Sequence, residues 1–110
     1  MFKIVANPTF TATVRLSIPG SDVPGAVQIT FRHKGTRALH AWLASAAKRE
    51  TDTEFLGEII ENWQGVADVD GQPLAYTPDA LAQLLDAYPA AGKEIIQAYN
   101  RQLADARAGN

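Results

Sequence analysis

The sequence contains no cysteine, and this absence excludes several classes of function. A 110-residue chain without thiols cannot form a disulfide framework, a thiolate metal site or a thiol redox centre. Long hydrophobic runs are absent too: residues 38–47, the longest stretch with little charge, reach about half the length of a membrane span. The Asn7-Pro8 pair interrupts the short apolar stretch at the N-terminus, so a secretory signal is not expected. We therefore expect a soluble, cytoplasmic protein with no membrane partner.

Basic residues are not in excess. Ten Lys and Arg residues face twelve Asp and Glu residues, which gives a formal net charge of −2. Binding to nucleic acid depends on a strong positive field, so we expect no nucleic-acid partner. The densest basic group is Arg32, Lys34 and Arg37, followed at a distance by Lys48 and Arg49. We interpret it as a solvated face and keep Arg32, Lys34 and Arg37 as candidate protein-interaction residues.

Motifs for catalysis and metal binding are also missing. The chain has no G-x-S-x-G nucleophile motif and no glycine-rich phosphate loop. His33 and His40 lack the i, i+4 spacing of a helical metal site. The segment that begins at Asp68 resembles the start of an EF-hand loop, but its sixth and twelfth positions are Pro73 and Asp79 instead of Gly and Glu. We expect no catalytic residue, no metal and no cofactor, and hence no enzyme.

Two strands are predicted near the N-terminus. Apolar and polar residues alternate from Phe10 to Ile18 and again from Val27 to His33, which is typical of half-buried strands. The Pro- and Gly-containing loop between them predicts an antiparallel hairpin over about residues 10–34. A lone hairpin is marginal in water, so helices or another chain must cover its apolar face. Its free edge could also accept a strand from a partner.

Two helices are predicted next along the chain. The first begins with Thr36 as its N-cap and presents an apolar stripe to the core. The second begins at Thr51, which has capping-box spacing to Glu54, and ends at Gly65. The stripe of the first helix is Leu39, Trp42, Leu43, Ala46 and Ala47, and that of the second is Phe55, Leu56, Ile59, Ile60 and Trp63.

The C-terminal half predicts a turn and two further helices. Asp70-Gly71 marks a tight turn within residues 66–76. Thr77-Pro78 begins a helix that extends to about Ala87, and Tyr88-Pro89 ends it. Pro89 then opens the last helix, whose apolar stripe is Ile95, Ile96, Tyr99 and Leu103. The predicted fold is a single α+β domain over residues 1–110: an N-terminal antiparallel hairpin packed with about four helices, the helical part covering about residues 36–106.

The two tryptophans each allow two interpretations. Trp42 and Trp63 both lie on predicted apolar stripes, and core burial is the common role of such residues. Tryptophan is also enriched in protein interfaces. Trp63 is the better candidate for an interface anchor because it lies at a predicted helix end beside Gly65.

The order of residues in the C-terminal half resembles the tail assembly chaperones of long-tailed bacteriophages. The resemblance covers about half of the chain, and the order and spacing of the pieces are more distinctive than any one piece. The pieces are Phe55-Leu56, Trp63-x-Gly65-Val66-x-Asp68, Asp70-Gly71 with Pro73, Tyr76 to Leu81, Leu84-Leu85, Tyr88-Pro89, and Ile95, Ile96 and Tyr99.

This resemblance implies a non-enzymatic role in tail morphogenesis. Such chaperones bind the tape-measure protein, keep its apolar helical stretches soluble and recruit tail-tube subunits around it. They act in the cytoplasm of the bacterial host, during infection or from a prophage, and are not retained in the mature virion. A homo-oligomer is compatible with this role. Two alternatives stay open: a small structural tail or connector protein, which would remain in purified particles, and a nucleic-acid-binding regulator, which would show salt-dependent binding.

Overall fold

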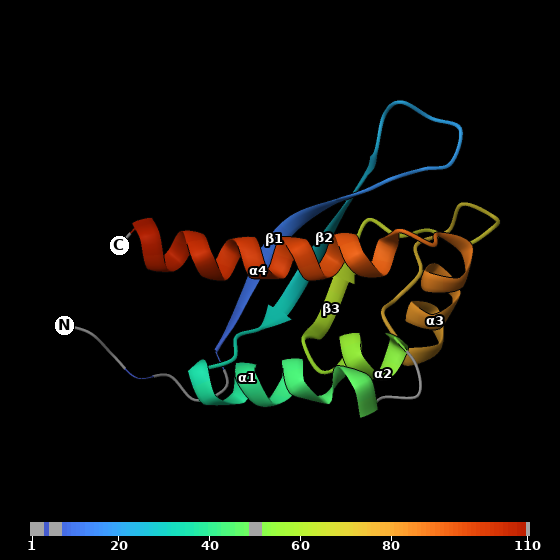
Figure 1. Ribbon diagram of the computed structural model, residues 1–110. Helices are drawn as coiled ribbons and strands as arrows, with labels where there is room; N and C mark the ends of the chain where they lie inside the picture. The colour runs from blue at the N-terminus through green and yellow to red at the C-terminus, as the bar shows by residue number, and fades with distance from the viewer. Residues whose placement is uncertain (1–3, 5–7, 49–51, 110) are drawn as a thin grey trace.

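The computed structural model describes the backbone of residues 4, 8–48 and 52–109. The elements are β1 (Thr9–Leu16), β2 (Gly25–Arg32), α1 (Thr36–Ala44), the 3-10 helix η1 (Ser45–Lys48), α2 (Asp52–Gly57), β3 (Ile60–Gln64), α3 (Pro78–Ala87) and α4 (Ala91–Gly109). Figure 1 shows a small sheet with the long helix α4 across its face, α1 and α2 at one end and α3 to one side, near β3. The predicted α+β class with an N-terminal antiparallel hairpin is confirmed.

The sheet is antiparallel with the strand order β1-β2-β3. β1 and β2 pair from Thr9 opposite Arg32 to Leu16 opposite Gly25. Alternate side chains are buried, as the sequence predicts, because a strand points successive residues to opposite faces. The other face is polar and exposed, with the hydroxyl groups of Thr11 and Thr30 3.1 Å apart across β1 and β2.

The prediction that the second helix continues to Gly65 is wrong. α2 ends at Gly57, and the chain then forms β3. Thr30 of β2 pairs with Asn62, but the next residue, Phe31, pairs with Ile60, so Glu61 is an extra residue in a β-bulge. The bulge brings Ile60 and Trp63, three residues apart, to the buried face. A spacing of three apolar positions is typical of a helix, and this explains the error.

The helix ends confirm some predicted caps and correct others. Thr36 is not an N-cap: it is the first residue of α1, and Gly35 occupies the cap position without a side-chain hydrogen bond. The predicted bounds of α3 are confirmed, and the Thr77 hydroxyl accepts a hydrogen bond from the Ala80 amide at 3.0 Å. The capping box that starts at Thr51 and the position of Arg49 lie outside the described residues.

The last helix begins later than predicted. α4 starts at Ala91 rather than at Pro89, since residues 89–90 form a turn in which the Ala91 amide donates to the Tyr88 carbonyl. The predicted stripe of α4 is confirmed in its packing, with Ile95, Tyr99 and Leu103 buried and Ile96 half-buried against the core.

An aromatic cluster closes one end of the core. The Tyr99 ring of α4 lies 5.2 Å from Phe31 and 5.6 Å from Trp42, and Trp42 stacks on Phe55 at 4.2 Å. Their polar atoms are satisfied: the Trp42 indole donates to the Phe55 carbonyl at 2.8 Å, and the Tyr99 hydroxyl donates to the Arg32 carbonyl at 2.8 Å. Satisfied polar groups allow these large rings to be buried without a desolvation penalty.

α1 carries less of the core than its predicted stripe suggests. Trp42 is buried and Leu39 is half-buried, but Leu43 and Ala46 are exposed. Along the described part of the chain, no helix combines the length and the hydropathy that a membrane crossing requires.

Candidate functional site

Trp63, the predicted interface anchor, lies in the core. Its side chain is 4% exposed, and its indole nitrogen donates to the Leu74 carbonyl at 2.8 Å. The ring meets Tyr76 edge-on, with 5.0 Å between the ring centroids. These contacts tie β3 to the segment before α3. The surroundings of Trp63 therefore favour the core interpretation over the anchor.

The three predicted cations lie near the end of β2. Arg32 donates from Nη1 to the carbonyl oxygens of Gly57 at 3.1 Å and Ile60 at 3.0 Å, so it links the end of α2 to the bulged start of β3. Lys34 Nζ lies 3.9 Å from a carboxylate oxygen of Glu58. Arg37 is exposed in the first turn of α1.

The four predicted residues do not form one surface. Trp63 points into the core, Arg32 links α2 to β3, Lys34 is half-buried and Arg37 is exposed. A role of these residues in a protein interface stays a prediction. His33 and His40 are exposed, and among the described residues no group of three or more His, Asp and Glu side chains is placed to hold a metal ion.

Two tyrosines have perturbed ionisation, and both lie in the folded core. Burial raises the pKa of the Tyr99 hydroxyl, against a smaller lowering by its hydrogen bond from the Lys34 amide. Burial also raises the pKa of Tyr76, against a smaller lowering by the positive charge of Arg32. In both residues burial is the larger cause, so the shifts follow from packing.

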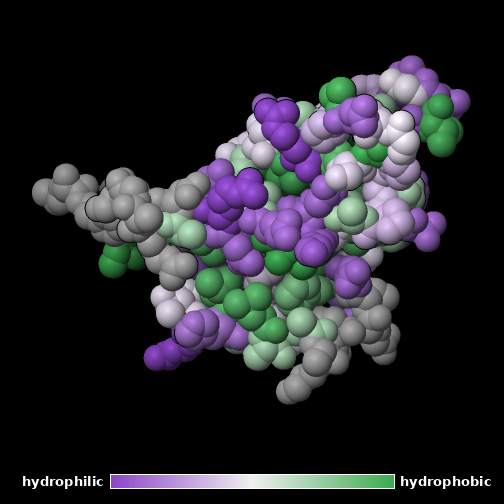
Figure 2. Space-filling view, turned by 45° about the horizontal axis from the view of Figure 1, so that its top comes forward, coloured by the Kyte–Doolittle hydropathy of each residue, from purple (hydrophilic) through white to green (hydrophobic). Residues whose placement is uncertain are grey.

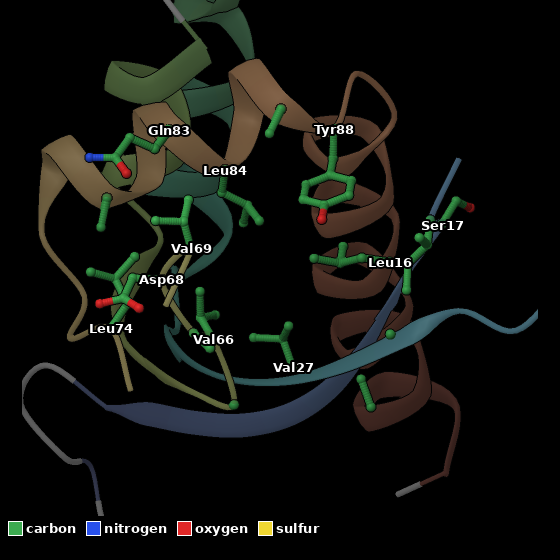
Figure 3. A pocket seen from close by; sticks show the side chains of 17 residues that line it. Leu16, Ser17, Val27, Val66, Asp68, Val69, Leu74, Gln83, Leu84 and Tyr88 are labelled. Atoms are coloured by element: carbon green, nitrogen blue, oxygen red, sulfur yellow. The ribbon is translucent and has the colours of Figure 1, made fainter. Parts of the chain in front are cut away.

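An open apolar groove is the best candidate for a binding site. It has a volume of about 380 Å³. For comparison, a cavity of ~150 Å³ is enough to bind benzene, so this groove could hold several aliphatic side chains. Figure 3 shows three walls: the loop end of the β1–β2 hairpin, the segment 65–74 after β3, and α3 with the Tyr88 ring. Its labelled apolar side chains are Leu16, Val27, Val66, Val69, Leu74, Leu84 and Tyr88.

Gly65 positions the second wall. Its φ of +94° is a conformation that residues with a Cβ rarely adopt. A Cβ at this position would lie 3.3 Å from the carbonyl oxygen of Ala26, so the chain passes β2 closely as it turns. This close passage brings Val66 beside Val27 in the groove.

Hydrogen bonds from backbone amides hold the turn after Gly65. Asp68 Oδ1 accepts from the amides of Asp70 at 2.9 Å and Gln72 at 3.0 Å, and the Leu74 amide donates to the Val66 carbonyl at 2.8 Å. The turn predicted at Asp70-Gly71 is confirmed as a small hairpin, with an isolated bridge between residues 67 and 73. This arrangement leaves the Val69 side chain fully exposed beside the groove.

The third wall is one face of α3. The helix lines the groove with Ala80, Gln83, Leu84 and Ala87, the i, i+3, i+4, i+7 set of a single face. At the far end, Ser17 links the hairpin to α4: its amide and its hydroxyl both donate to the Glu94 carboxylate, at 3.0 Å and 2.5 Å. Both groups of Ser17 therefore take part in the link between the hairpin and α4.

The groove was not predicted from the sequence. Its lining comes from segments about 50 residues apart, and their meeting depends on the bulged β3 that the periodicity concealed. One signal was available: Val69 is an apolar residue between two aspartates in a predicted turn, where solvent exposure is expected. The structure also exposes Ile18, Val23 and Leu43, and Figure 2 shows hydrophobic surface among polar residues on one face.

Comparison with known proteins matches the chain to a protein family. The family model is described as phage tail assembly chaperone and matches residues 1–110, the whole chain. No curated protein and no solved structure matches the chain.

Proposed function

Because the chain belongs to the phage tail assembly chaperone family, we propose that it binds the tape-measure protein and recruits tail-tube subunits during tail morphogenesis. The family establishes a part in tail assembly and implies a role without catalysis. The partners, the site on this chain and the place of action belong to the proposal. We place the protein in the cytoplasm of the bacterial host and outside the finished virion.

The open groove carries the proposal of a client site. A chaperone that holds apolar helical segments needs apolar surface that its own fold leaves uncovered. The groove supplies it between rigid walls, with Val69 and Ile18 exposed at its margin. Binding at one such groove is expected to be weak. Several copies on one long tape-measure chain would raise the overall affinity through effective concentration.

Association of several copies of the chain with one another would support the same role. Copies bound along a tape-measure chain would be neighbours, and contacts between them would extend the covered length. We therefore include a homo-oligomer in the proposal, with the groove reserved for the client.

A filled groove tests this proposal. Ala87 is exposed and lines the groove from α3, so Ala87→Trp should obstruct it without opening the core. Ala82 is exposed on the same helix and lies outside the lining, so Ala82→Trp is the matched control. Each variant is produced together with the tape-measure protein. We expect the wild type and Ala82→Trp to keep the tape-measure protein soluble and to co-purify with it, and Ala87→Trp to lose both properties.

Two results would contradict the proposal. Equal co-purification of all three proteins would exclude the groove as the client site. Recovery of the chain in purified virions by mass spectrometry would contradict its absence from the mature particle and favour a structural tail protein.

A further inference from the structure

The charged residues in the two segments that line the groove are all acidic. Residues 16–31 and 64–92 contain every lining residue, and neither segment has a Lys, Arg or His. They carry five aspartates, all of them exposed: Asp22, Asp68, Asp70, Asp79 and Asp86. An apolar groove whose lining segments carry carboxylates and no cation imposes an electrostatic condition on its ligand.

Four of the five aspartates lie in the lining or next to a lining residue. Asp68 is itself in the lining, and Asp70 follows the exposed Val69 at the tip of the turn. On α3, Asp79 and Asp86 lie four residues before and three residues after Gln83, so they share its side of the helix.

The two cations nearest to these segments in the sequence do not cancel the negative charge of the aspartates. Arg15 precedes the lining residue Leu16 but lies on the opposite, polar face of β1. Lys93 lies on α4 next to Glu94, whose carboxylate binds Ser17. The end of the molecule that holds the groove is therefore acidic.

We infer that the groove selects polypeptide segments in which apolar side chains are flanked by Lys or Arg. This inference rests on the proposed function, because it names the chemistry of the client at the same site. Lys and Arg suit such a margin in two ways: their aliphatic stems can cover exposed apolar surface, here Val69 and Ile18, while their charged ends reach carboxylates. A segment flanked by Asp or Glu would meet like charges on each side of the groove.

Two labelled peptides test the inference. Both carry the same leucine-rich helical centre, and they differ only in two Lys or two Glu residues at each end. By fluorescence anisotropy at low salt, the full-length protein should bind the Lys peptide roughly tenfold more tightly than the Glu peptide, the size expected from a few exposed ion pairs. The preference should shrink as ionic strength rises.

A charge-neutral variant identifies the source of the preference. Asp70→Asn/Asp86→Asn removes two carboxylates and should preserve the fold, since Asn-Gly also favours the turn and an acidic residue at the end of a helix opposes its dipole. Glu58→Gln/Glu61→Gln removes the same charge away from the lining and is the matched control. We expect the first variant to lose most of the preference for the Lys peptide and the control to retain it.

The other outcomes each overturn the inference in a distinct way. If both peptides bind equally and Ala87→Trp abolishes both, the charge selection is refuted while the groove remains the client site. If neither peptide binds, the proposed groove site fails together with the inference. If the groove is filled by a second copy, sedimentation will show self-association that Ala87→Trp removes and that neither peptide displaces.

Discussion

The two ends of the sheet's apolar face differ in how they are covered. At the end of β2 near Phe31, rings from α1, α2 and α4 close over the sheet and every described buried polar side-chain atom has a hydrogen-bond partner. At the other end, near Val27, the segment 65–74 and α3 stand apart and leave an open groove. The apolar face of one sheet thus belongs to a closed core at one end and lines an open groove at the other.

Local restraints shape two walls of the groove. Gly65 with its positive φ and the two amides bound by Asp68 shape the wall of residues 65–74, and the bond from Ser17 to Glu94 ties the hairpin wall to α4. Apolar walls without such restraint would gain free energy by moving together and excluding water. The closed end is expected to determine stability, and the open end to determine binding.

The largest effect is expected from Trp63→Ala. Removing this buried side chain leaves a cavity and the Leu74 carbonyl without its donor, so the free energy of unfolding should fall by about 3–5 kcal/mol. Chemical denaturation measures the loss. A protein of unchanged stability that no longer binds its client would restore Trp63 as an interface anchor.

A smaller, pH-dependent effect is expected from Tyr99→Phe. The variant loses the hydrogen bond to the Arg32 carbonyl, at a cost of about 1–3 kcal/mol near neutral pH. Because folding raises the pKa of Tyr99 above its ordinary value of 10.0, its contribution is complete below pH 10.0 and is lost as pH rises through the folded pKa.

Unfolding curves measured at alkaline pH test whether ionisation of Tyr99 destabilises the folded protein. The wild type should lose stability above pH 10.0 more steeply than Tyr99→Phe, which keeps only the part due to Tyr76. Parallel curves for the two proteins would show that the Tyr99 hydroxyl does not contribute to alkaline unfolding.

The smallest effect on stability is expected from Val69→Ser. The side chain is fully exposed, so unfolding should change by no more than about 0.5 kcal/mol. Client binding, measured by isothermal titration calorimetry, should weaken, because Val69 borders the groove. A clear loss of stability would indicate that Val69 packs in the folded protein, and unchanged binding would remove it from the site.

Local signals in the sequence predicted much of the fold. Thr77-Pro78 and Tyr88-Pro89 defined α3 at both ends, because capping and the restriction before proline act within a few residues. Alternation predicted β1 and β2 for the same reason. β3 could not be predicted from local signals. Its bulge at Glu61 is defined by how the neighbouring residues pair with β2, and it spaces the buried residues Ile60 and Trp63 as in a helix.

The candidate site was much less predictable than the fold. Its walls are distant in sequence, and a groove is the space that folded segments leave between them. The sequence places Trp63 at the end of a predicted helix, which favours an anchor, but the residue lies on the buried face of β3. The family, by contrast, was recognised from the order of ordinary turn and helix residues, and the match over residues 1–110 confirms it.

Methyl NMR of the full-length chain during titration with a tape-measure fragment is the most direct measurement. We predict that the largest shifts will occur at Val66, Val69, Leu74 and Leu84, which line the groove, while Ile29 in the closed core stays unchanged. Shifts confined to Leu39 and Leu43 of α1, with the groove methyl groups unmoved, would contradict the assignment of the groove as the binding site.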